Sequence, residues 1–249
     1  MRIQMDQVQA TKAILTGAAV GRPRPRGWFH VGLSGVLLLF VVVGFSPTFF
    51  LRPAFTDRPL PLYLYVHGSV LTLWFSLGFV QSALVVARRT SLHRRLGVVG
   101  GLTAAALVPL SGLVAVQAIP RYMAAGVTPA EIQFIVIGDL ISLVVFSGLV
   151  TAALVWRHHR EWHRRLMVVA SIMIIGPAIA RLERVGLAVP VPAVLLGLLI
   201  ALGVYDTLQL GRVHRATVMS ACVVLVSLGV LLLVVGTRTA KIVIEGLSP

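Results

Sequence analysis

The segment 134–156, FIVIGDLISLVVFSGLVTAALVW, decides the class of this protein. Its only charged residue is Asp139, and it is long enough to cross a bilayer core of roughly 30 Å, which takes about 20 helical residues. In lipid every backbone N–H and C=O needs an internal partner, and a run of Leu, Val, Ala and Gly of this length meets that need as a helix rather than as a barrel strand. The segment therefore predicts a transmembrane helix.

Six other apolar runs occupy most of the remaining chain. They lie at 28–45, 62–87, 96–118, 166–180, 191–205 and 216–235. The overall composition agrees with them, because 57% of the residues are hydrophobic and only 12% are charged, unlike the usual soluble mixture. We expect an all-α, polytopic membrane helical bundle with about seven transmembrane helices.

The basic residues predict the orientation of this bundle. With seven crossings, fifteen of the 22 Lys and Arg residues fall on one side, together with the amino terminus, and seven fall on the other. Positive residues stay cytoplasmic during insertion, so we expect the amino terminus inside and the carboxyl terminus outside. The predicted organisation is a basic cytoplasmic tail at 1–27, a single transmembrane domain at 28–236 and a short external tail at 237–249.

The net charge of +14 is explained by this distribution and needs no nucleic acid. Basic loops beside a bilayer meet anionic lipid headgroups first. We therefore expect the lipid bilayer as a partner and no nucleic acid. Cys222 is the only cysteine, which excludes an intramolecular disulfide and any CxxC pair.

The tetrapeptide HRRL occurs twice, at 93–96 and 163–166, each time at the start of an outward-running helix. Other matches share the same offset of seventy, such as Gly68 with Gly138. This pattern indicates an internal duplication, in which two hairpins of equal orientation form parallel repeats about an axis along the membrane normal. The alternative is that low-complexity Leu, Val and Ala sequence matches itself by chance.

The two HRRL histidines form the first candidate site. His93 and His163 start their helices, where the positive end of the helix dipole keeps an imidazole neutral and able to bind metal. If their helices face each other, the pair would supply two axial nitrogens to the iron of haem b. The adjacent arginines would then pair with the haem propionates. These are Arg94, Arg95, Arg164 and Arg165. The alternative is a positive-inside anchor in which each histidine caps a turn.

A second candidate site lies toward the opposite side of the membrane. Ionisable groups within a bilayer are costly and therefore mark candidate sites. His67 and Asp139 fall in the outer parts of their helices, while Arg181 and Glu183 follow the run 166–180 on the same side. These four residues predict an outer polar pocket. The alternative is an Asp139–Arg181 ion pair that only ties helices together.

Three stretches resemble an uncharacterised family of bacterial multi-pass membrane proteins. They are GFSPTFFLRP at 44–53, YVHGSVLTLWFSLGFVQSALVVARRTSLHRRLG at 65–97 and HREWHRRLMVVASIMIIGPAIARL at 159–182. The resemblance covers 44–182 and rests on a His67, Gln81 and HRRLG signature. It implies a bacterial cytoplasmic membrane location and no particular activity.

The chain also has a weaker similarity to the transmembrane di-haem b-type cytochromes. That family has a His near the start of one core helix, an HR pair at the start of the next and a further His on each of the following two helices. His67, His93 and His163 are similar to three of these positions, whereas the segment 134–156 has Asp139 and no His. The similarity implies electron transfer through haem b.

Three hypotheses for function stay open at this stage. The first is a redox protein that binds haem or quinone through His93 and His163 and exchanges electrons with a redox partner. The second is a small-solute transporter that uses the outer polar pocket. The third is a membrane assembly or interaction protein without chemistry of its own. The sequence predicts no oligomeric state.

Overall fold

A computed structural model describes residues 27–247, and this part of the chain is helical with no strand. The helices are α2 (Trp28–Gly44), α3 (Leu62–Val86), α4 (Thr90–Ala124), α5 (Pro129–Val155), α6 (Arg160–Met173), α7 (Gly176–Ala180), α8 (Val191–Leu210), α9 (Arg215–Val234) and α10 (Arg238–Leu247). Short turns η1 (Ser46–Phe50), η2 (Arg52–Ala54) and η3 (Arg181–Val185) connect them. The all-α prediction is confirmed for these residues. The predicted tail at 1–27 lies outside the described residues except for Gly27.

The long helices have the dimensions and composition of membrane spans. Five of them, α3, α4, α5, α8 and α9, are long and apolar enough to cross a membrane. A sixth span results if α6 and the segment Gly176–Val185, bent by 42° at their junction, are taken together. Large apolar side chains point outward along these helices, as Val144 and Leu233 do. The described chain is therefore a multi-pass membrane helical bundle.

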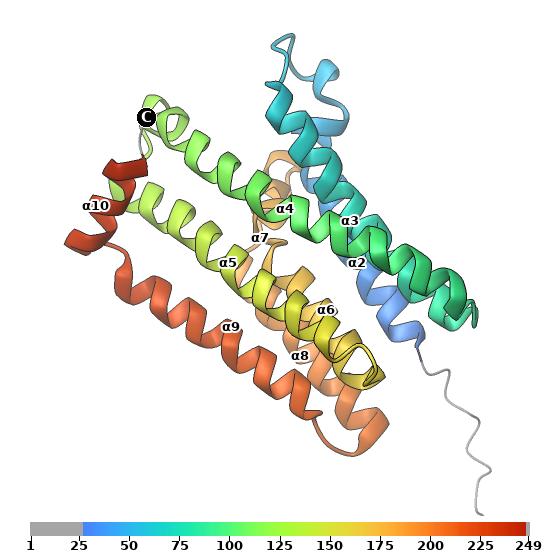
Figure 1. The fold of residues 1–249 in the computed structure, drawn as a ribbon. Coiled ribbons are helices and arrows are strands. Elements are labelled where there is room, and N and C mark those ends of the chain that lie inside the picture. Colours follow the sequence, from blue (N-terminus) through green and yellow to red (C-terminus); the bar gives the residue numbers. More distant parts are fainter. Residues whose placement is uncertain (1–26, 248–249) are drawn as a thin grey trace, which may run out of the picture.

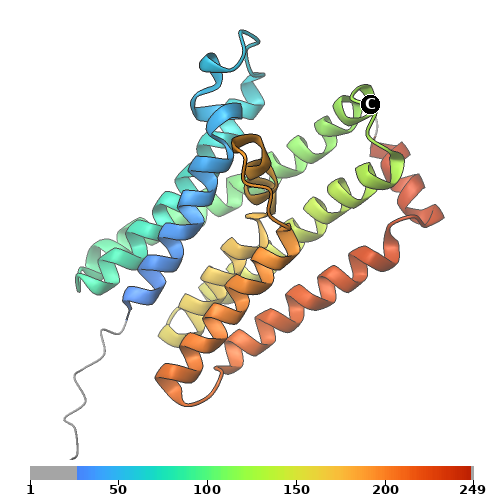
Figure 2. The ribbon, with the colours of Figure 1, turned by 180° about the vertical axis from the view of Figure 1, so that it is seen from behind.

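Helix α6 occupies the centre of the bundle. It packs against α2, α5, α8 and α9, and Figures 1 and 2 show these elements running lengthwise beside one another. The main core draws fully buried side chains from four of them, including Phe146 of α5, Ile172 of α6 and Leu202 of α8. This packing buries Arg165 in the second turn of α6, whereas Arg160 at the start of the helix stays exposed.

Local sequence signals explain several helix ends. The Thr128 hydroxyl accepts the N–H of Glu131 at 3.4 Å, and the Glu131 carboxylate accepts the N–H of Thr128 at 3.0 Å. This reciprocal capping box, followed by Pro129 at the first helical position, starts α5. Helix α8 ends at Gly211, whose φ of 70° lies in the left-handed region that glycine adopts without steric cost.

The run 166–180, predicted as one helix in which Pro177 permits a kink, is broken in the structure. Helix α6 ends at Met173, and α7 begins at Gly176 with Pro177 in its first turn. Proline has no N–H for the preceding turn and its ring clashes with that turn, so it favours a break at this point. In contrast, α4 continues without a break through Pro109.

The bent segment brings the backbone of α7 directly against α2 at Gly44. A Cβ added to Gly44 would lie 2.1 Å from the carbonyl oxygen of Ala178. Since the obstacle is backbone rather than a flexible side chain, Gly44→Ala is expected to destabilise the protein by about 1–3 kcal/mol. Thermal unfolding in detergent measures this effect. Gly32→Ala is the matched control, because a Cβ at Gly32 meets nothing within 4 Å. Equal unfolding temperatures for the two variants would contradict the close contact of α2 and α7.

The predicted external tail contains a helix that the sequence reasoning did not identify. Helix α10 is amphipathic, with Ala240 buried and Ile244 and Leu247 packed beside Ile132 and Val136 of α5. Because ten residues are too few for a membrane span, the length of this segment predicts a tail rather than a transmembrane helix. Its apolar residues at helical spacing are the signal that identifies it.

Candidate functional site

The structure brings the two HRRL histidines together at one end of the bundle. This end, named the inner end, holds the starts of α4, α6 and α9 and the ends of α3, α5 and α8. The ring centres of His93 and His163 lie 6.4 Å apart, with an angle of 86° between the ring planes. Both residues are half-buried. The rings thus form an edge-to-face contact although their helices start seventy residues apart.

Hydrogen bonds orient each of these residues. The Nδ1 atom of His163 lies 2.8 Å from the carbonyl oxygen of Ala153. A carbonyl only accepts, so Nδ1 carries the hydrogen and the lone pair of Nε2 is free to bind a metal. This is the arrangement in which metal-binding histidines are held. At His93 the backbone carbonyl accepts from Nε2 of Gln81 at 3.1 Å, which ties the start of α4 to α3.

The ring separation is suited to a single metal ion. Two imidazoles on opposite sides of one metal, with metal–nitrogen distances of roughly 2 Å, have ring centres about 6 Å apart. The observed 6.4 Å equals this separation within a few tenths of an ångström, and it is also the separation of an ordinary edge-to-face contact between rings. In the part of the chain that the structure describes, no group of three or more His, Cys, Asp or Glu residues converges on a metal position. Two imidazoles alone are the protein donor set of a haem iron rather than of a closed zinc site.

The arginines expected to meet haem propionates have different environments. Arg94 and Arg95 are exposed. Arg164 donates from Nη2 to Glu161 at 2.5 Å. Arg165 is fully buried, and each of its three guanidinium nitrogens donates to Asp206 or Glu161. Arg165 is therefore already paired within the protein and is not available to a cofactor carboxylate.

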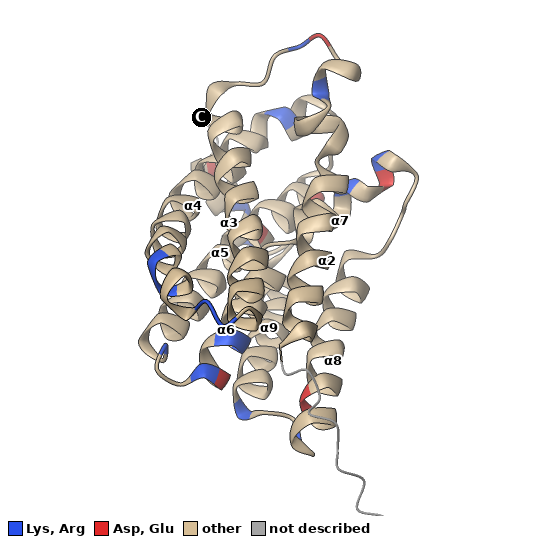
Figure 3. Ribbon diagram, turned by 90° about the vertical axis from the view of Figure 1, so that its right-hand side faces the viewer, with Lys and Arg blue, Asp and Glu red and all other residues tan. Residues whose placement is uncertain are grey.

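Asp206 is the partner that sequence reasoning missed. It is fully buried on α8 and accepts from Nε of Arg165 at 2.9 Å, from the Thr217 hydroxyl at 2.5 Å and from the N–H of His214 at 3.1 Å. The carboxylate thereby joins α6, α8 and the start of α9. Asp206 directly follows the apolar run 191–205, and a charge at that place is the signal that identifies it. Figure 3 shows charged segments gathered near the labelled α6.

His214 completes this network at the start of α9. Its Nδ1 accepts the N–H of Ala216 at 3.1 Å, so the ring caps the helix. Burial, assisted by the nearby charge of Arg165, lowers the pKa of His214 below its ordinary value. The ring is therefore neutral at pH 7, as an acceptor requires.

At the opposite, outer end the structure gathers three of the four predicted pocket residues. Asp139 and His67 each interact electrostatically with Arg181, and Nδ1 of His67 lies 3.4 Å from the Ser111 hydroxyl. Arg181 donates to the carbonyl of Pro177 at 2.8 Å and lies 4.9 Å from the ring centre of Phe45. Within residues 27–247 no ion pair joins Asp139 to Arg181.

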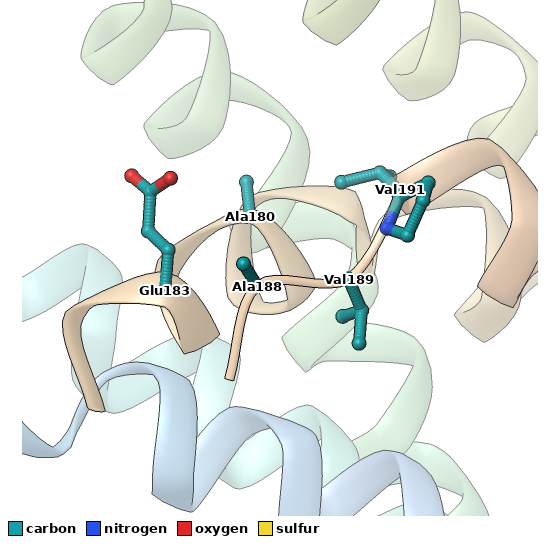
Figure 4. A pocket seen from close by; sticks show the side chains of 6 residues that line it. Ala180, Glu183, Ala188, Val189 and Val191 are labelled. Atoms are coloured by element: carbon teal, nitrogen blue, oxygen red, sulfur yellow. The ribbon is translucent and has the colours of Figure 1, made fainter. Parts of the chain in front are cut away.

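Glu183 does not belong to this outer group. Its side chain is exposed and lines a shallow depression between α7 and α8, together with Ala180, Ala188 and Val191 (Figure 4). Tyr122 of α4, which the sequence reasoning did not include, interacts electrostatically with Arg181 instead. The outer polar group is therefore His67, Ser111, Tyr122, Asp139 and Arg181.

The fold and the two ends define a class, a multi-pass membrane helical bundle with a histidine pair and a buried ionic network at one end. Comparison of the chain with protein-family models, curated proteins and solved structures finds no match.

Proposed function

We propose that the protein is an integral membrane redox protein in which His93 and His163 bind one metal, with haem b as the electron-carrying form. The ring pair carries this proposal, because two imidazoles at 6.4 Å offer the spacing and the donor set of a bis-histidine centre. The free Nε2 of His163, inferred from its contact with Ala153, supports it further.

The topology belongs to the same proposal. Five single spans, the bent α6–α7 span and the 17-residue α2 together make seven crossings. A helix of about 17 residues is at the lower limit for a span. The inner end carries more Lys and Arg than the outer end, so it faces the cytoplasm, with the amino terminus inside and the carboxyl terminus outside. With the family resemblance described above, we propose that this membrane is the cytoplasmic membrane of a bacterium.

Each residue of the centre then has a defined task. His93 and His163 hold the metal, the carbonyl of Ala153 fixes the tautomer of His163, and Gln81 fixes the first turn of α4. Bound haem supplies one-electron transfer, and its potential depends on the axial ligands and their hydrogen bonds. At this depth the electrons would pass to a cytoplasmic redox partner or to a quinone.

The content of metal and haem in the purified protein tests this function. Protein produced in haem-supplemented cells is expected to retain one haem per chain. A stoichiometric metal without haem would keep the bis-imidazole centre but reject haem as the electron carrier. Protein that contains neither, after mild purification, would contradict the proposed function.

A second candidate function, small-solute transport, is favoured by the break between α6 and α7. Discontinuous membrane helices next to buried ionisable groups form substrate sites in transporters. Here Arg181 and Asp139 lie beside the broken segment.

If this candidate is correct, Asp139→Asn is expected to abolish ion-dependent uptake in proteoliposomes, because the amide cannot exchange a proton or bind a cation as a carboxylate does. Asp57→Asn, in an exposed loop, is the control and is expected to leave uptake unchanged. Equal uptake by both variants would contradict transport through this group. If the protein binds no haem or metal and shows no ion-dependent uptake, the remaining hypothesis is a membrane assembly role.

A further inference from the structure

Buried polar atoms without a hydrogen-bond partner are concentrated at the inner end. Among the described residues they occur on His30, Gln81, His93 and Arg164, and elsewhere only on Thr48. His30 is 6% exposed, and neither of its ring nitrogens has a partner within the described chain. Native interiors pair nearly all such atoms with protein or ordered water, so this grouping needs an explanation.

Contacts link these residues into one group. The ring of His30 lies 5.1 Å from that of Tyr205, and the Arg164 guanidinium carbon lies 6.0 Å from the centre of the same Tyr205 ring. Arg164 is the next residue after His163 in the sequence, and the ring of His163 lies 6.4 Å from that of His93. Gln81 donates to the backbone carbonyl of His93. The group therefore crosses the bundle from α2, through α8 and α6, to α4 and α3.

The hydrogen-bonding capacity of these unpartnered side-chain atoms identifies the ligand. Nε of Arg164 only donates, Oε1 of Gln81 only accepts, and the neutral ring of His30 offers one donor and one acceptor. An anion would satisfy only donors and a metal ion only acceptors, whereas water satisfies both. We infer that these residues form a hydrated pocket, in which ordered water molecules connect His30 to the His93–His163 pair.

Such a pocket would give protons from the cytoplasmic end a route to the histidine pair while the side chains stay buried. The charged groups that act on His30 are Arg164, Arg165, Glu161 and Asp206, and the ring of Tyr205 lies against it. Glu161 is accessible enough to meet solvent. The inference depends on the unpartnered atoms and not on a bound metal, so it stands or falls separately from the proposed redox function.

Radiolytic hydroxyl-radical footprinting of the full-length protein in detergent tests the pocket, because ordered internal water labels buried residues beside it. His30 and Tyr205 are expected to be oxidised several-fold faster than Phe75 and Phe146, which are equally buried in the apolar core. Oxidation of His30 as slow as that of Phe146 would overturn the inference.

A variant interrupts the proposed water chain. His30→Phe is expected to reduce labelling at His93 several-fold, because the ring it introduces cannot bind water. Ser34→Ala lies one turn away on α2, where Ser34 pairs with Ser82, and is expected to leave His93 labelling unchanged. If His30→Phe does not fold, the comparison of His30 with Phe146 in the unaltered protein still decides. Unchanged His93 labelling in folded His30→Phe would exclude a connected chain.

Discussion

Replacing Asp206 with alanine is expected to lower the free energy of unfolding by about 3–5 kcal/mol, because the change leaves the buried charge of Arg165 without its main partner. Both side chains are fully buried, so water cannot replace the lost carboxylate without reorganising the bundle. The Thr217 hydroxyl and the N–H of His214 also lose their acceptor. Thermal or denaturant unfolding in detergent measures the loss.

A matched set of variants separates pairing from packing. Asp57→Ala removes an exposed carboxylate and is expected to change stability little. The double variant Asp206→Leu with Arg165→Met removes both charges and is expected to recover much of the loss, since a buried ion pair replaced by apolar groups of similar size is often neutral. A double variant less stable than Asp206→Ala would contradict the unpaired charge as the cause.

The second large effect concerns the histidine pair. His93→Ala and His163→Ala are each expected to lower haem or metal affinity by at least about 10- to 100-fold, the loss seen when even an outer-shell partner of a metal site is removed. Titration of haem-depleted protein measures the affinity. His158→Ala is the control, because His158 is exposed in the loop before α6, five residues from His163.

Adding imidazole to the buffer distinguishes a ligand role from a folding role. Imidazole can occupy the space left by the deleted ring and is expected to restore part of the binding in both alanine variants. A misfolded variant would not respond. If both alanine variants bind as tightly as the His158→Ala control, the pair is not the ligand set.

Composition and length were sufficient to predict the five long apolar helices, whereas the predicted total of seven spans stays a prediction. The runs 62–87 and 191–205 coincide with α3 and α8 within a few residues, because a bilayer requires long, uninterrupted apolar segments. Helices α4 and α6 begin six residues before the predicted apolar runs 96–118 and 166–180, because their first turns contain the polar HRRL segments.

The details that the sequence did not reveal depend on contacts between distant elements. Glu161, four residues before Arg165, is visible in the sequence as a partner, but the pairing with Asp206 is not, because Asp206 lies forty-one residues away on another helix. Pro177 predicts a kink in the run 166–180, but the packing of α7 against the backbone of α2 at Gly44 could not be predicted from it. Glu183 follows Arg181 by two residues within η3, but its side chain is exposed, which the sequence does not reveal.

The spin state of the bound iron tests the central claim most directly. Optical and EPR spectra of haem-supplemented wild-type protein are expected to show one low-spin, six-coordinate haem, because His93 and His163 both bind the iron. His93→Ala and His163→Ala are each expected to convert any remaining haem to the high-spin form. A colourless wild-type protein, or a low-spin spectrum that survives in both variants, would contradict a centre formed by these two histidines.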